Sequence, residues 1–102
     1  MTTAYRASRA LLSTPTSYTV TVGDPLIIAT PDGKSLPRPL LLQIGPGSGG
    51  TMTIETRAAA GAAWIAWPDG ASAVATQRMF DAPCQAIRVT AGVANGIFSI
   101  GD

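Results

Sequence analysis

Residues 51–57 read Thr-Met-Thr-Ile-Glu-Thr-Arg, and this stretch decides the fold class. Polar residues alternate with apolar ones, which is the period of a strand with one buried and one exposed face. We therefore expect Met52 and Ile54 to point into a core and Glu55 and Arg57 to point outward.

Other stretches have strand character and are separated by turn-forming residues. Alternation recurs at residues 18–22 and 84–91, and short apolar runs lie at residues 26–30 and 40–44. The dipeptide Asn95-Gly96 is typical of a hairpin turn. Turn signals spaced by about ten residues predict an all-β domain, a sandwich or jelly-roll-like fold of about seven to eight short antiparallel strands.

The expected domain covers residues 18–102 and is preceded by an N-terminal arm at residues 1–17. The arm has no strand period, and residues 4–12 have the spacing of a short helix that is marginal by itself. A signal-peptide pattern is not visible in the arm, so we expect the protein to be made and kept in a reducing cytoplasm, or assembled there into something larger.

Three further segments have less distinct secondary-structure patterns. Residues 62–67 are expected to form a strand, and residues 71–77 an edge strand or an irregular return. The glycine-rich residues 45–50 are expected to form a flexible hairpin or a loop between sheets. They satisfy the pattern G-x-G-x-x-G, but a dinucleotide site needs a helix to follow the glycines, and here a strand pattern follows.

Charge is scarce in this chain. Charged residues make up 13% of the 102 residues, against about 25% in ordinary soluble domains. Histidine is absent and the formal net charge is +1. We therefore expect no nucleic-acid groove and, since no apolar run has the length of a membrane span, no membrane insertion. A surface poor in charge can be covered by a partner without the desolvation penalty of buried ions.

The sequence predicts neither an enzyme nor a cofactor or metal site. Catalytic arrangements that need histidine are impossible, and the six carboxylates do not have the spacing of a calcium loop. Asp24, Asp32 and Asp69 stand beside Pro or Gly, where Asp commonly supports a turn. The single cysteine, Cys84, is expected to be a buried apolar residue and not a reactive thiol.

The segment Trp64-Ile65-Ala66-Trp67 carries both tryptophans. On a strand they point to opposite faces, so we expect one to be buried and the other partly exposed. An exposed tryptophan serves as a subunit or partner contact, as cover for another segment, or as a platform for a sugar ring.

The order of three segments resembles that of small β-structured virion proteins of tailed bacteriophages. These segments are residues 51–57, residues 64–70 with Trp-Ile-Ala-Trp-Pro-Asp-Gly, and residues 83–91 with Pro-Cys-Gln-Ala-Ile-Arg-Val-Thr-Ala. The resemblance covers about residues 50–101. It implies a structural protein of the particle, either a capsid decoration (cement) protein or a fibre component, and no catalytic residue.

From the residues and the resemblance together we expect a homo-oligomeric virion protein. It would stabilise the capsid shell by contacts with the major capsid protein or another virion protein. The expected contact residues are Tyr5, Leu11, Leu12, Trp64 and Trp67, together with the loop at residues 45–50. The alternative is a glycan- or receptor-binding module of a tail fibre or spike.

Overall fold

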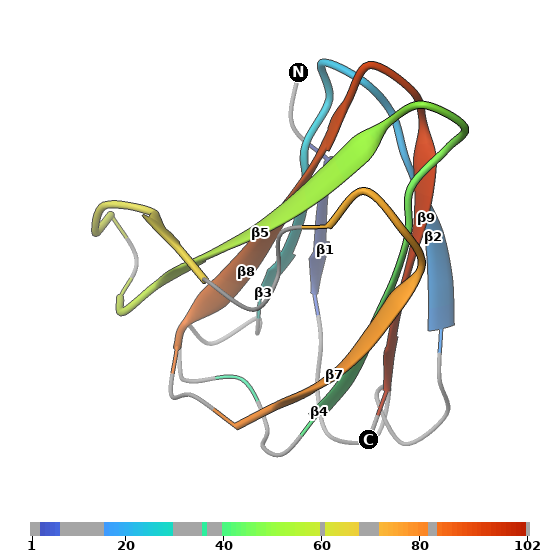
Figure 1. Cartoon of the computed structure of the whole chain (residues 1–102). Coiled ribbons are helices and arrows are strands. Elements are labelled where there is room, and N and C mark those ends of the chain that lie inside the picture. Colours follow the sequence, from blue (N-terminus) through green and yellow to red (C-terminus); the bar gives the residue numbers. More distant parts are fainter. Residues whose placement is uncertain are drawn as a thin grey trace.

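The protein folds into two β-sheets that face each other, as the computed structural model shows (Figure 1). The structure describes residues 3–6, 16–29, 36, 40–59, 61–67, 72–81 and 84–101. The five-stranded sheet contains, in spatial order, β1 (Thr3–Arg6), β3 (Leu26–Ala29), β8 (Ala86–Gly92), β5 (Thr51–Arg57) and β6 (Ile65–Ala66). The four-stranded sheet contains β2 (Thr16–Val20), β9 (Gly96–Gly101), β4 (Leu40–Gly45) and β7 (Thr76–Phe80).

Strands β2 to β9 pair in a nested order along the sequence. The first pairs with the last, β2 with β9, and then β3 pairs with β8, β4 with β7, and β5 with β6, all antiparallel. Two more antiparallel pairs, β4 with β9 and β5 with β8, join these ladders into two sheets. This nested order is that of a jelly roll. The prediction of an all-β domain, a sandwich or jelly-roll-like fold, is confirmed as an all-β sandwich.

Strand β1 is the departure from the expected pattern. It pairs with β3 in parallel, with Thr3 opposite Leu26 and Arg6 opposite Ala29. The prediction of a helix is therefore wrong for residues 4–6, where backbone pairing to the edge of β3 replaces a helix that has little stability alone. The proposed start of the domain at residue 18 falls inside β2, which begins at Thr16. Residues 7–15 lie outside the described part of the chain.

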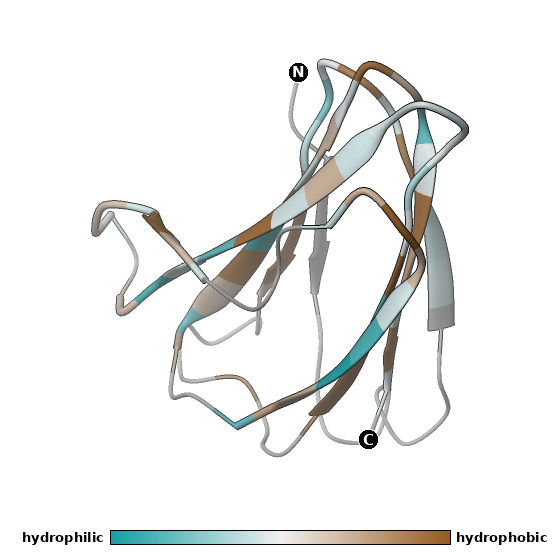
Figure 2. Cartoon of the chain, viewed as in Figure 1, coloured by the Kyte–Doolittle hydropathy of each residue, from teal (hydrophilic) through white to brown (hydrophobic). Residues whose placement is uncertain are grey.

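The core lies between the sheets and follows the alternation read from the sequence. Along β5, hydrophobic and hydrophilic residues take turns (Figure 2), and Met52 and Ile54 are buried as predicted. From the opposite sheet Phe98 and Ile100 of β9 and Phe80 of β7 are fully buried. Because one side chain in two enters this layer, each strand keeps a second, outward row of side chains.

The chain changes sheet at nearly every connection, and this corrects the predicted hairpin at Asn95-Gly96. Strand β8 belongs to the five-stranded sheet and β9 to the four-stranded sheet, so the turn between them crosses the sandwich. Val93 there has a positive φ of 72°. The loop at residues 45–50 also crosses between sheets, as one of its two predicted forms required. Only β5 and β6 are consecutive strands that pair with each other.

Candidate functional site

The outer face of the four-stranded sheet carries one continuous row of uncharged polar side chains. The strand register places Ser17, Ser99, Gln43 and Gln77 side by side across all four strands. The two serine Oγ atoms are hydrogen-bonded at 2.7 Å, and Gln43 Nε2 donates to Gln77 Oε1 at 2.6 Å. Hydrogen bonds along the row hold these groups in place without an ionic partner.

The rest of this face is apolar or small. Ile97, which is 47% exposed, and Gly45 flank the polar row on one side, and Leu41 and Met79, which is 63% exposed, flank it on the other. The outward positions of the four strands carry no charge. Arg78 of β7 is not one of them, because it alternates with Met79 and shares the side of Phe80, although it is itself exposed on this edge strand. We call this surface the neutral face; it comprises Ser17, Thr19, Leu41, Gln43, Gly45, Gln77, Met79, Ile97 and Ser99.

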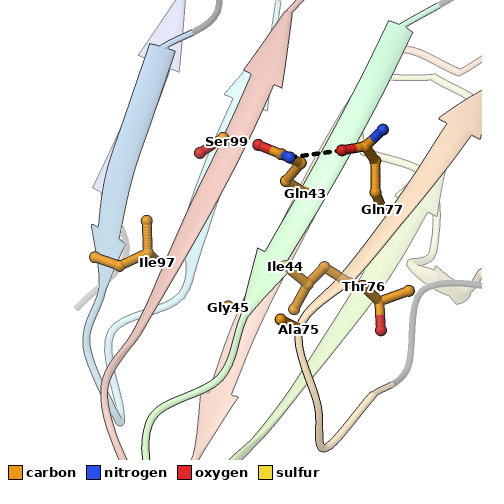
Figure 3. A pocket seen from close by; sticks show the side chains of 8 residues that line it. All are labelled: Gln43, Ile44, Gly45, Ala75, Thr76, Gln77, Ile97 and Ser99. Atoms are coloured by element: carbon orange, nitrogen blue, oxygen red, sulfur yellow. Dashed lines mark hydrogen bonds between the residues drawn. The ribbon is translucent and has the colours of Figure 1, made fainter.

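An open concavity of about 420 Å³ indents one end of the neutral face (Figure 3). Its lining residues are Gln43, Ile44, Gly45, Ala75, Thr76, Gln77, Ile97 and Ser99. The turn before β7 forms one rim. In that turn Ser72 Oγ donates to the carbonyl oxygen of Val74 at 2.6 Å and lies 2.8 Å from Thr76 Oγ1. These bonds within the turn fix the position of Ala75 at the rim.

The outer face of the five-stranded sheet is different, because it gathers charge around an aromatic ring. Arg88 donates from Nε to Glu55 Oε1 at 2.9 Å, and its Nη2 lies 2.8 Å from the same oxygen. Arg57 Nε donates to Oε1 of the buried Gln85 at 2.7 Å. Both guanidinium groups lie over the ring of Trp64, at 4.7 and 4.8 Å from its centroid. We call these five residues the charged cluster.

The two tryptophans point to opposite sides, as the sequence predicts. Trp67 packs against the core and meets Phe80 edge-on, with ring centroids 5.1 Å apart. Trp64 lies on the outside in the charged cluster and is half-buried beneath the two arginines. Trp67 is therefore a packing residue of the sandwich, whereas Trp64 is a surface residue.

The remaining expected contact residues lie in different parts of the fold. Tyr5 stands on β1 opposite Ile28, and Leu11 and Leu12 lie outside the described residues. The loop at residues 45–50 lies beside the turn between β8 and β9, where Gly47 approaches the backbone of Asn95 so closely that no Cβ fits. Cys84 is 3% exposed and belongs to the core, so its predicted burial is confirmed.

The described residues contain no group of three or more His, Cys, Asp or Glu side chains that is arranged to hold a metal ion. Nor does any helix suited to crossing a membrane occur in the described ranges. The two surfaces above are thus the features of the described chain from which a function can be argued.

Comparisons with known proteins return no match: no family model, no curated protein and no solved structure is similar to this chain. The chain's own chemistry must therefore carry the functional argument.

Sequence reasoning anticipated a surface suited to being covered but missed the neutral face. The alternation in residues 40–45 and 96–101 gives the outward positions one strand at a time. It does not reveal that β4 and β9, which are distant in sequence, are neighbours in register. The polar row exists only once that pairing is known.

Proposed function

We propose that the protein is a structural component of a bacteriophage particle, a capsid decoration protein that binds the assembled shell through the neutral face. The observation that carries the proposal is that no outward position of a whole four-stranded sheet bears a charge. A surface that must stay solvated usually mixes charges of both signs. A surface that becomes covered in an assembly is depleted of charge at its centre.

The composition of the neutral face fits a contact repeated many times over a shell. Exposed Ile97 and Met79 supply apolar area, and the carboxamides of Gln43 and Gln77 supply hydrogen-bonding groups. Neither kind of group imposes the penalty of burying an ion. Contacts that are individually weak become stable when symmetry repeats them.

The fold class supports the same reading by analogy, since jelly rolls occur in viral capsid proteins. The proposed partners are the major capsid protein or another virion protein, together with further copies of this chain. The protein's place is then the virion, after assembly in the host cytoplasm. An enzymatic activity is not part of the proposal.

The test introduces one charge into the neutral face without changing its shape. Gln77→Glu replaces a carboxamide by a carboxylate of the same size on an exposed side chain. Co-sedimentation with empty shells of the major capsid protein should weaken by about ten-fold or more, because the partner now buries an ion. Lowering the pH toward the ordinary pKa of glutamate should restore binding, since the protonated form is neutral.

Asn95→Asp is the matched control for this test. It adds the same charge at the turn between β8 and β9, outside the neutral face, and keeps the Oδ1 that accepts a hydrogen bond from the Val22 amide. This variant should sediment with shells as the parent protein does. Failure of the parent to bind shells, or equal losses in both variants, would overturn the proposal.

A second candidate function follows from the concavity. Gln43, Gln77 and Ser99 offer uncharged hydrogen-bonding groups of the kind that match sugar hydroxyls, which favours a glycan-binding module of a fibre or spike. The concavity is lined by no aromatic residue, and Trp64 belongs to the charged cluster on the other sheet. Shell binding therefore ranks first. Retention on a polysaccharide column that is lost in Gln43→Ala, without shell binding, would reverse this order.

A further inference from the structure

Arg57 is held in one orientation but has no ionic partner among the described residues. Its Nε donates to Gln85 Oε1 at 2.7 Å, and its backbone carbonyl accepts a hydrogen bond from the Gln85 amide at 2.8 Å. Gln85 is only 4% exposed, so this anchor is itself fixed. The guanidinium is thus oriented by a neutral group, and its charge is not compensated by that group.

Arg88, on the same sheet, is an arginine whose charge is compensated by an ionic partner. Glu55 stands directly opposite Arg88 in the register of β5 and β8 and accepts from both Nε and Nη2. Arg57 stands opposite Ala86, where no acceptor side chain exists. The charged cluster therefore contains two guanidinium groups and one carboxylate, and its excess positive charge sits at Arg57.

The surroundings of Arg57 combine this charge with apolar surface. Trp64 precedes β6, so the pairing of Thr56 with Ile65 brings its ring beside Arg57. Ile65 is 64% exposed but alternates to the other side of the strand, so the apolar part of this surface is the exposed portion of the Trp64 ring. Figure 1 shows the segment with Trp64 and Ile65 (yellow) projecting beyond the two sheets. Aromatic residues and arginine are the side chains most often found at the energetic centres of protein interfaces.

We propose that Arg57 and Trp64 form a binding site for a carboxylate side chain of a partner protein segment, with an apolar neighbour of that carboxylate in contact with the exposed portion of the Trp64 ring. The two Nη groups of Arg57 are the donors, since Nε is occupied by Gln85. This site lies on the opposite sheet from the neutral face and does not depend on the shell-binding proposal. A protein with both sites has two independent contact surfaces.

The experiment uses the full chain labelled with ¹⁵N and two capped peptides, acetyl-Leu-Glu-Leu-amide and acetyl-Leu-Gln-Leu-amide. The chain has two tryptophans, so it gives two indole signals, and one of them serves as an internal control. The Glu peptide should shift the indole signal of Trp64 and the Arg57 Nε–H signal. The Trp67 signal should stay in place, because that ring packs against Phe80. The Gln peptide should bind at least about ten-fold more weakly than the Glu peptide.

Two variants of equal charge locate the site. Arg57→Gln should weaken the response to the Glu peptide about ten-fold or more, whereas Arg78→Gln, at an exposed position of β7, should leave it unchanged. If Arg57→Gln does not fold, Arg57→Lys keeps the charge, loses the planar donor pair and should weaken the response several-fold. Equal responses to the two peptides, or an undiminished response in the folded Arg57 variant, overturn the proposal.

Sodium acetate and sodium phosphate separate the proposed ligand from simple anions. Acetate carries the carboxylate without the apolar neighbours, so it should need a several-fold higher concentration than the Glu peptide for the same shift. If acetate or phosphate binds Trp64 and Arg57 as tightly as the Glu peptide does, the site is a general anion site and the assignment to a protein segment is wrong.

Discussion

The two outer faces of this sandwich have opposite chemistry, although the sheets share one core. On the neutral face, four strands present hydroxyls, carboxamides and apolar groups, and two hydrogen bonds join polar side chains of neighbouring strands. On the other sheet, the charged cluster gathers two arginines and one glutamate around Trp64. Alternation along a strand ties every second residue to the core and leaves the others free to vary. The composition of the outward positions therefore indicates what kind of surroundings each face contacts.

Truncating a buried side chain should destabilise the protein to a similar extent in either sheet. These substitutions have the largest expected effect. Phe98 of β9 is fully buried, so Phe98→Ala should lower the free energy of unfolding by about 3–5 kcal/mol in urea denaturation. Ile54→Ala, under the five-stranded sheet, should cost about 2–5 kcal/mol. A loss below about 1 kcal/mol for either variant would mean that only one sheet is anchored by this core.

Two glycines on neighbouring strands, Gly96 and Gly45, allow the inner and outer sides of the same sheet to be compared by substitution. A Cβ at Gly96 would lie 2.6 Å from Met52 Sδ and 2.8 Å from the backbone oxygen of Gly45. Gly96→Ala should therefore destabilise the fold by about 1–3 kcal/mol. A Cβ at Gly45 meets nothing closer than 3.5 Å, so Gly45→Ala should change stability by less than about 0.5 kcal/mol. Equal thermal shifts in the two variants would contradict this difference.

The ion pair of the charged cluster should respond to salt. A double-mutant cycle of Glu55→Gln and Arg88→Gln, measured by urea denaturation, should give a coupling of about 0.5–1 kcal/mol at low ionic strength. At 1 M salt most of this coupling should vanish, because the two side chains are partly exposed and the screening length falls to about 3 Å. A coupling that survives 1 M salt would show a pair that solvent does not reach.

The polar row of the neutral face should give the smallest effect and no salt response. The corresponding cycle of Gln43→Ala and Gln77→Ala breaks one exposed hydrogen bond between neutral groups. We expect a coupling of about 0.5 kcal/mol, equal at low and high salt. A salt-dependent value would show that a charge acts on the neutral face, and the contrast between the two faces would be lost.

The sequence was sufficient for the fold class because alternation is local. Residues 51–57 match β5 at both ends, and the predicted strands at residues 26–30, 40–44 and 84–91 each agree with an observed strand to within two residues. Strand β1 was not predicted, since Thr3–Arg6 depends on the edge of β3 and not on its own pattern. The predicted strand at residues 62–67 is reduced to Ile65–Ala66, the two residues in register with β5; next to them the Trp67 amide still donates to the Ile54 carbonyl oxygen at 2.9 Å.

The candidate sites were less accessible from the sequence. The outward direction of Glu55 and Arg57, and the opposite directions of Trp64 and Trp67, could be read from the period. Their grouping could not, because the contact of Trp64 with Arg88 requires β5 to lie between β6 and β8. The neutral face depends in the same way on β9 lying between β2 and β4. Register between distant strands is a tertiary property.

The nested pairing of the strands has a consequence for how this chain is made. Strand β9 is synthesised after the other eight strands, yet it joins β2 to β4, and Ser17 contacts Ser99 across 82 positions of sequence. Contacts so distant along the chain make folding slow, because the entropy of closing long loops is lost before most pairs form. Until β9 arrives, β2 and β4 have open edges that other chains can pair with. Nascent chains and chains truncated before β9 should therefore be prone to aggregation, and the neutral face should form only after β9 has been synthesised.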